Sequence, residues 1–210
     1  MNRVMKSVVA AVSLGLLLTP ALAGCAANAP TVTTSPSPVT GTSVDEVVLQ
    51  MKQQAPEAGT DAALAWEALT GADGEYAAAA SYQAVLDQFG QVEPYSTILA
   101  AELRHVSALT RQLEGMGVTV PSNPYLGVVA APEDLQAAAQ AWADGEVLNV
   151  ALYDELLADA KSSNLIRVFT NLRRASQESH FPMFELAAAG DGTLAADQMS
   201  GMQGSGGMHG

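Results

Sequence analysis

The chain has 210 residues, of which 22 are acidic and only 9 are lysine or arginine, and its formal net charge is −13 at pH 7. A surface this acidic repels nucleic acid and anionic lipid headgroups, which excludes nucleic acid as a partner and favours cations, small molecules or basic proteins. The single cysteine, Cys25, excludes an intrachain disulfide.

Residues 1–24 predict a secretory signal peptide. Arg3 and Lys6 precede an apolar run over residues 8–18, which is too short to span a bilayer, and small residues follow it. The sequence Leu-Ala-Gly-Cys at 22–25 resembles the bacterial lipobox, so we expect Cys25 to be lipidated and to become the new N-terminus. The alternative is an ordinary secretory signal with a chance cysteine. Cleavage removes two basic residues and no acidic one, which takes the formal charge from −13 to −15.

The segments on either side of the folded part have biased compositions. Residues 25–43 are rich in Ala, Pro, Thr and Ser and predict a lipidated tether that holds the domain at the cell membrane, outside the cytoplasm. Residues 191–210 are rich in Gly and Met and are expected to be disordered. Met199, Met202, Met208 and His209 could bind copper(I) there, but they have no fixed spacing, so a disordered surface is favoured over a copper site.

Residues 44–190 predict one all-α domain. Short helices are expected over Val44–Gln54 and Asp61–Leu69, and long helices over residues 73–89, 94–116, 132–160 and 164–189. Pro94 begins the second long helix, and glycines follow three of the long helices. The break at 161–164 is short enough to make the last two helices antiparallel neighbours. These elements predict an antiparallel four-helix bundle with short N-terminal helices and disordered tails.

Polar side chains interrupt the apolar faces of these helices. Glu146 lies within the seam of the third long helix, and Glu102 and His105 share the inward face of the second. Glu75 lies on the apolar face of the first long helix, and His180 lies on or beside the seam of the fourth. A buried carboxylate is costly unless it is protonated, paired or bound to metal.

Few cationic side chains fall on the same faces, so three carboxylates and two imidazoles at similar depth predict a divalent cation site. Carboxylate and imidazole ligands suit iron, manganese or zinc. The alternative is that Glu75 and Glu146 lie at exposed helix ends while His105 and His180 are hydrogen-bonded core residues.

At these residues the chain resembles the ferritin-like superfamily, which includes the rubrerythrins, and more closely the domain-of-unknown-function 2202 family. The resemblance covers residues 73–189 and rests on four stretches: Glu75-Tyr76-Ala77-Ala78 with Tyr82, Ala101 to His105, Glu146 with Tyr153-Asp154, and Ser176 to His180 with Phe184. It implies metal ligands at Glu75, Glu102, His105, Glu146 and His180. Tyr82, Asn149 and Tyr153 would then orient these ligands, and core packing is the alternative role of the two tyrosines.

The fourth helix departs from the family pattern, because Gln177 stands where the family has a glutamate. Gln177 is therefore expected to be a weak ligand or a hydrogen-bond partner of one. Three carboxylates do not neutralise two divalent ions, so the second metal position is expected to be weak or empty and a mononuclear site is the alternative. The resemblance implies a degenerate iron or manganese site with minor redox or metal-handling activity. The alternative function is a non-catalytic helical scaffold, or a module that binds an unidentified partner protein, with a vestigial metal site.

Overall fold

The computed structural model describes residues 42–204, and within that range every regular element is a helix. The predicted signal peptide, the lipidation site Cys25 and all but the last two residues of the tether lie outside the described residues, as do Met208 and His209. None of the described helices is both long enough and apolar enough to cross a membrane. The helices are α1 (Val44–Gln54), α2 (Asp61–Thr70), α3 (Glu75–Phe89), α4 (Tyr95–Gly115), α5 (Leu135–Asp159), α6 (Ser163–Ala175), the π-helix η1 (Ser176–His180), α7 (Phe181–Ala188) and α8 (Ala196–Gly204).

Polar side chains fix where several of these helices begin. Ser43 and Glu46 form a reciprocal capping box at the start of α1, and Thr60 and Asp134 accept hydrogen bonds from backbone amides in the first turns of α2 and α5. Such caps satisfy amide groups that have no partner within the helix. The described helices follow the predicted ones within a few residues at each end.

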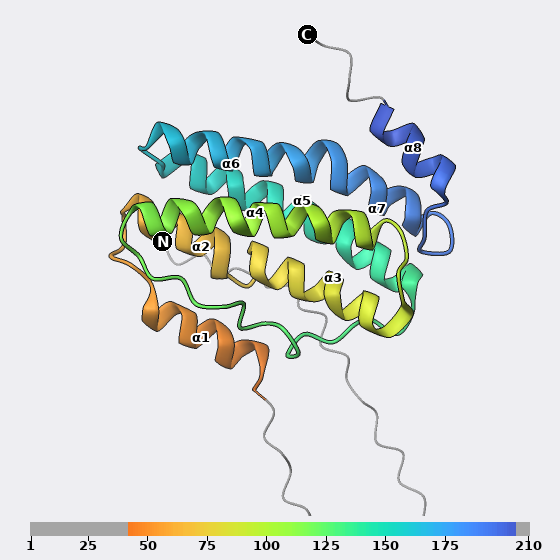
Figure 1. Cartoon of the computed structure of the whole chain (residues 1–210), viewed down its shortest axis with the longest axis horizontal. Coiled ribbons are helices and arrows are strands. Elements are labelled where there is room, and N and C mark those ends of the chain that lie inside the picture. Colours follow the sequence, from red (N-terminus) through yellow and green to blue (C-terminus); the bar gives the residue numbers. More distant parts are fainter. Residues whose placement is uncertain (1–41, 205–210) are drawn as a thin grey trace, which may run out of the picture. The chain divides into compact units, whose positions relative to one another are not determined.

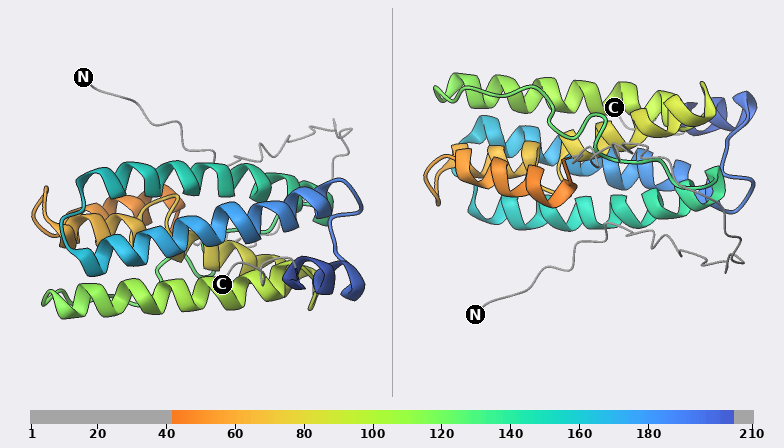
Figure 2. Two further views of the ribbon diagram at one scale, coloured as in Figure 1. Left: turned by 90° about the horizontal axis from the view of Figure 1, so that it is seen from above. Right: turned by 90° about the horizontal axis from the view of Figure 1, so that it is seen from below.

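The long helices lie side by side along one direction (Figures 1 and 2). Helices α2 and α3 follow one another along one line beside α4, and α6, η1 and α7 form one continuous helix beside α5. The connection over residues 116–134 runs back along the length of α4, so that α4 and α5 point the same way. The Tyr125 hydroxyl holds this connection in place by donating to the Thr70 carbonyl at 2.7 Å.

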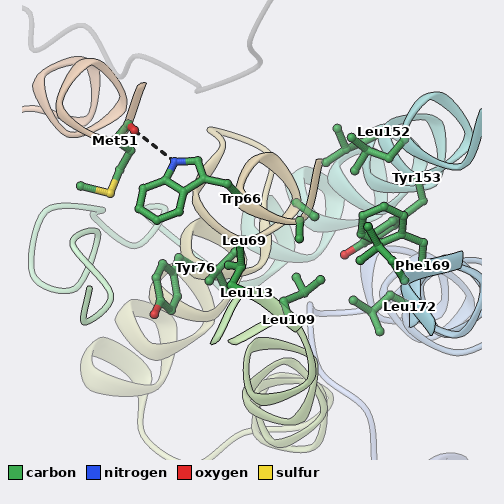
Figure 3. Packing of buried hydrophobic residues seen from close by; sticks show 14 of the residues in the cluster. Met51, Trp66, Leu69, Tyr76, Leu109, Leu113, Leu152, Tyr153, Phe169 and Leu172 are labelled. Atoms are coloured by element: carbon green, nitrogen blue, oxygen red, sulfur yellow. Dashed lines mark hydrogen bonds between the residues drawn. The ribbon is translucent and has the colours of Figure 1, made fainter. Parts of the chain in front are cut away.

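The core consists of two separate apolar clusters, one toward each end of the long helices. The first contains Trp66, Leu109 and Phe169, and the Trp66 indole nitrogen also donates to the Met51 carbonyl at 3.1 Å (Figure 3). The second contains Ile98 and Phe184. Each long helix contributes to both clusters, which leaves a layer between them at mid-length.

Two predictions about the last part of the chain are wrong. The segment 164–189 is not one regular α-helix, because a π-helical turn occupies its middle. The region after residue 190 is not wholly disordered, because α8 forms there and Leu194 and Met199 are buried in the second cluster. Met199 therefore belongs to an apolar core and is not part of a free methionine-rich tail.

Candidate metal centre

Five predicted ligands meet in the layer between the two apolar clusters. Glu75 is the first residue of α3, Glu102 and His105 lie one turn apart in the middle of α4, Glu146 lies in the middle of α5, and His180 ends η1. The three glutamates and His180 are each at most 4% exposed, and His105 is partly buried. The prediction that these side chains point inward is confirmed, and none of the glutamates lies at an exposed helix end.

Glu75 reaches the interior because α3 begins deep in the protein. Gly74 precedes it, and a Cβ at Gly74 would lie 2.7 Å from the Ala68 carbonyl oxygen, which is closer than side-chain carbons come to such atoms. The close approach of the chain between α2 and α3 therefore requires glycine at this position. The short connection between α2 and α3 places Glu75, the first residue of α3, against α4 and α5.

Glu102 is the centre of the arrangement, because its two oxygens face different imidazoles. Its Oε2 lies 3.0 Å from His105 Nδ1, and its Oε1 lies 3.0 Å from His180 Nδ1. The two imidazole rings are stacked at 25° with centroids 5.5 Å apart. One carboxylate thus lies between two nitrogen ligands that come from different helices.

Each imidazole also has a second carboxylate beside it. Glu75 Oε2 lies 3.4 Å from His105 Nδ1, and Glu146 Oε1 lies 3.4 Å from His180 Nδ1. We call Glu75, Glu102 and His105 the outer triad, and Glu102, Glu146 and His180 the inner triad. Within each triad the ligand atoms lie within 4.8 Å of one another, and Glu102 belongs to both.

Two buried tyrosines donate hydrogen bonds to the two carboxylates that belong to only one triad each, Glu75 and Glu146. Tyr153 donates a short hydrogen bond to Glu75 Oε1, and Tyr82 donates to Glu146 Oε1 at 2.9 Å. Both hydroxyls therefore contact carboxylates of the cluster, and both tyrosine side chains also pack in the apolar core.

The carboxylates and imidazoles change one another's protonation. Burial and the neighbouring Glu102 charge raise the pKa of Glu75 to about 8. Burial by itself lowers the pKa of His105 and His180, but the adjacent carboxylates outweigh it and raise both pKa values to about 10. Burial would likewise raise the pKa of Glu102, yet Glu75 and the imidazoles hold it well below its usual range.

The prediction that Gln177 is a ligand is wrong. Its side chain is exposed and accepts a hydrogen bond from Arg173 Nη1 at 2.5 Å, and Arg173 also pairs with Asp154. In η1 the Phe181 amide donates to the Ser176 carbonyl five residues earlier, so this turn is wider than an α-helical turn. The wider turn directs His180 and Ser176 inward and leaves Gln177 outside.

Pro182 is the sequence signal that could have revealed this turn. A proline within a helix has no amide to donate and clashes with the carbonyl four residues earlier, which favours a local change of helical geometry. Asn149 was expected to orient ligands, but its side chain connects α5 to η1 and to the segment before α3. It accepts a hydrogen bond from Ser176 Oγ at 3.0 Å and donates one to the Asp73 carbonyl at 3.4 Å.

The donor set fits a divalent cation. Glu75 Oε2 and His180 Nδ1 are buried polar atoms without a hydrogen-bond partner, although other polar atoms lie near them. Buried atoms of this kind are costly unless another group satisfies them. Among the described residues, no lysine or arginine forms an ion pair with the three glutamates. Two carboxylates and one imidazole per position, all close together, are ligands that iron, manganese and zinc accept.

Comparisons of the sequence with protein-family models, with curated proteins and with solved structures find no match.

Proposed function

We propose that this chain is a divalent-metal-binding protein whose centre is formed by Glu75, Glu102, His105, Glu146 and His180. The observation that carries the proposal is the position of Glu102, which presents one oxygen to each imidazole in a layer from which water is largely excluded. A carboxylate in this position would help to hold a cation together with either imidazole.

The proposal includes a ferritin-like fold. Ferritin-like bundles contain one long connection that crosses back along the bundle, and they place carboxylates and Glu-x-x-His pairs on their inward faces. The long connection between α4 and α5 and the Glu102–His105 pair on α4 support this assignment. The missing carboxylate at Gln177 makes the site degenerate within that family.

The proposed metal is iron or manganese, which would supply Lewis acidity and one-electron redox chemistry when bound. The residues of the chain supply the rest. The three carboxylates and two imidazoles hold the cation, Tyr82 and Tyr153 orient the carboxylates, and the apolar clusters on both sides exclude water.

The proposal also includes a location outside the cytoplasm, with Cys25 as a lipid anchor. The lipobox-like sequence at 22–25 and the tether composition of the following residues support it. Such an anchor would hold the acidic domain at the cell membrane, on the cell surface or in the periplasm. The net negative charge of the domain favours the approach of cations.

The experiment compares metal content and metal-dependent stability in the full chain, in Glu102→Gln and in the control Glu114→Gln. Glu114 lies on the same helix but is exposed, so its replacement removes a carboxylate without touching the centre. A cation at 100 times its Kd stabilises the folded chain by about 2.7 kcal/mol. We expect this stabilisation in the full chain and in E114Q and its loss in E102Q.

Equal metal content in all three proteins, or none in any, would contradict the proposal. The helices would then serve as a scaffold for another partner.

A further inference from the structure

A cleft of about 410 Å³ lies between α3 and the turn over residues 126–129 of the connection from α4 to α5 (Figure 1). Ala80 and Ala84 line it from α3, and Leu126 and Val129 line it from the turn. Sites for small molecules usually have volumes of about 300–1,000 Å³, so this cleft is large enough for one. None of the five residues of the candidate metal centre lines it, so the cleft is separate from that centre.

Hydrogen bonds hold the turn that forms one wall of the cleft. Tyr125 is fully buried, and its hydroxyl donates to the Thr70 carbonyl at 2.7 Å. The Tyr125 carbonyl accepts hydrogen bonds from the Val128 and Val129 amides at 3.0 and 3.2 Å. The next side chain, Leu126, is left 54% exposed at the cleft. The cleft therefore exists before a ligand binds, which lowers the entropic cost of binding.

The polar side chains on the α3 wall present hydrogen-bond acceptors to the cleft. Gln83 and Asp87 lie one helical turn apart, and Gln83 Nε2 donates to Asp87 Oδ1 at 2.7 Å. Gln88 Nε2 donates to the Pro132 carbonyl at 3.3 Å. Each amide nitrogen thus has one partner already, whereas Asp87 Oδ2 and the two carboxamide oxygens accept no hydrogen bond from any described residue. A ligand that donates several hydrogen bonds fits this wall.

The charge around the cleft favours a cation. Within residues 42–204, no lysine, arginine or histidine forms an ion pair with Asp87. The formal charge of the chain, −13, acts in the same direction. One carboxylate beside neutral amides offers little charge to a divalent metal ion. It suits a primary ammonium group, which carries one positive charge and three N–H donors.

We propose that the cleft between α3 and the turn at 126–129 binds a small primary alkylammonium ion. The ammonium group donates to Asp87 and to a neighbouring carboxamide oxygen, from Gln83 or Gln88. The alkyl chain lies against the two alanines of α3 and Leu126. This site goes beyond the proposed metal-binding function and does not depend on it.

The test titrates the full chain, purified in detergent, with n-pentylammonium. Two probes with similar alkyl chains are compared with it: n-pentanol, which is neutral, and n-pentanoate, which is an anion. Binding is followed through the nuclear magnetic resonance shifts of the Gln83 and Gln88 side-chain amides. We expect saturable binding of one n-pentylammonium, and binding of the other two probes that is at least about tenfold weaker, because a charged donor strengthens the hydrogen bonds.

A matched pair of variants tests the carboxylate. Asp87→Asn removes the charge and keeps the shape, and it should weaken binding of n-pentylammonium by at least about tenfold. The control is Asp144→Asn on α5, because Asp144 is also exposed and accepts from Gln140 Nε2, four residues earlier, at 3.2 Å, but does not line the cleft. D144N should bind as the unaltered chain does. Both positions are exposed, and circular dichroism shows that each variant is folded.

A second pair tests the apolar wall. Leu126→Ala should weaken binding of n-pentylammonium by about threefold, because part of the alkyl chain loses its apolar contact. Leu103→Ala on α4 is the control, since Leu103 is also 54% exposed and lies outside the cleft. Equal affinities in these two variants would overturn the assignment of the ligand to this cleft.

Three further outcomes would overturn the inference. Equal affinities in D87N and D144N would mean that the acidic surface attracts the cation without a site. Binding of n-pentanol as tight as that of n-pentylammonium would overturn the ligand class, and no saturable binding by the unaltered chain would overturn the site. Glu102→Gln, which should lose the metal, should bind n-pentylammonium unchanged, so each proposal can fail without the other.

Discussion

Single residues at the centre of this protein differ from ordinary core residues in the direction of their polar atoms. The Tyr82 and Tyr153 hydroxyls donate to carboxylates of the centre, whereas the buried Tyr125 hydroxyl donates to the Thr70 backbone carbonyl. Tyrosines of similar burial therefore have different roles, which mutation can separate.

Replacement of Tyr153 by phenylalanine should weaken metal binding by about tenfold or more, because Glu75 would lose the donor that orients it. The control is Tyr125→Phe, which also removes one hydroxyl from a buried site. Y125F should lose about 1 kcal/mol of stability and leave the metal affinity unchanged. Titration with Mn²⁺ measures the affinity, and equal affinities in the two variants would contradict the assigned role of Tyr153.

The protonation of the centre predicts a dependence on pH. Burial and Glu102 raise the pKa of Glu75 from 4.5 to about 8. Neighbouring carboxylates, acting against burial, raise the pKa of His105 and His180 from 6.5 to about 10. All three groups bind protons more tightly in the folded than in the unfolded chain. The stability they contribute is complete below their unfolded pKa values and is lost as the pH rises through the folded ones.

In the presence of a chelator, the free energy of unfolding should therefore fall between about pH 6.5 and 10. Because a cation competes with the same protons, the stabilisation by Mn²⁺ should increase over that range. Urea unfolding with and without Mn²⁺ measures both effects. A stability that rises with pH in the chelated protein would show that these groups are not protonated as described.

At the scale of elements, the last helix and the segment after it depend on local geometry that composition does not reveal. The π-helical turn directs His180 inward, and the turn at 190–195 brings α8 against the second cluster. The Leu194 amide donates to the Glu93 carbonyl at 2.9 Å, which holds this turn against the segment before α4. Gly192 allows the turn because its φ is +88°.

Gly192→Ala should lower the free energy of unfolding by about 2 kcal/mol or more, because alanine strains at this φ and its Cβ would overlap the backbone of Leu135. Gly201→Ala is the matched control in α8, where a Cβ meets nothing within 4 Å. This control should be neutral or stabilising by up to about 1 kcal/mol. Thermal and urea unfolding measure both, and equal effects would mean that α8 does not pack as described.

At the scale of the whole molecule, two apolar clusters enclose one polar layer, and an acidic surface surrounds both. Burial in the clusters stabilises the fold and keeps water away from the layer, and the low dielectric constant there strengthens the interaction of its carboxylates with cations. The formal charge of −13 favours the approach of cations from solution.

Cys25→Ser should move the protein from the membrane fraction to the soluble extracytoplasmic fraction and abolish labelling with a radioactive fatty acid. The reason is that the acyl chains supply membrane affinity of roughly 0.8 kcal/mol per buried methylene, which serine cannot carry. Metal binding by the variant should be unchanged, which separates anchoring from the centre. Unchanged membrane association of the unlabelled variant would contradict the proposed anchor.

The sequence by itself predicted the helices and the inward direction of Glu102, His105 and Glu146, because helical spacing places Glu102 and His105 on one face and Glu146 within the seam of its own helix. For Glu75 and His180 the spacing left the direction open. The sequence did not reveal that the Gln177 side chain points outward. Spacing predicts a regular helix there, whereas Pro182 and the π-helical turn change the direction of the side chains. It also missed the packing of Leu194 and Met199, because a glycine-rich segment becomes ordered only against a surface built by other helices.

Which oxygen of Glu102 faces which imidazole was decided only by the tertiary structure. The ligands are separated by long stretches of chain, and their meeting depends on the relative positions of α3, α4, α5 and η1 along the long axis. A shift of one helix by a single turn moves its side chains by about 5.4 Å, which is more than the separation of the ligand atoms. Spacing within one helix contains no information about that shift, whereas the packing of two apolar clusters fixes it.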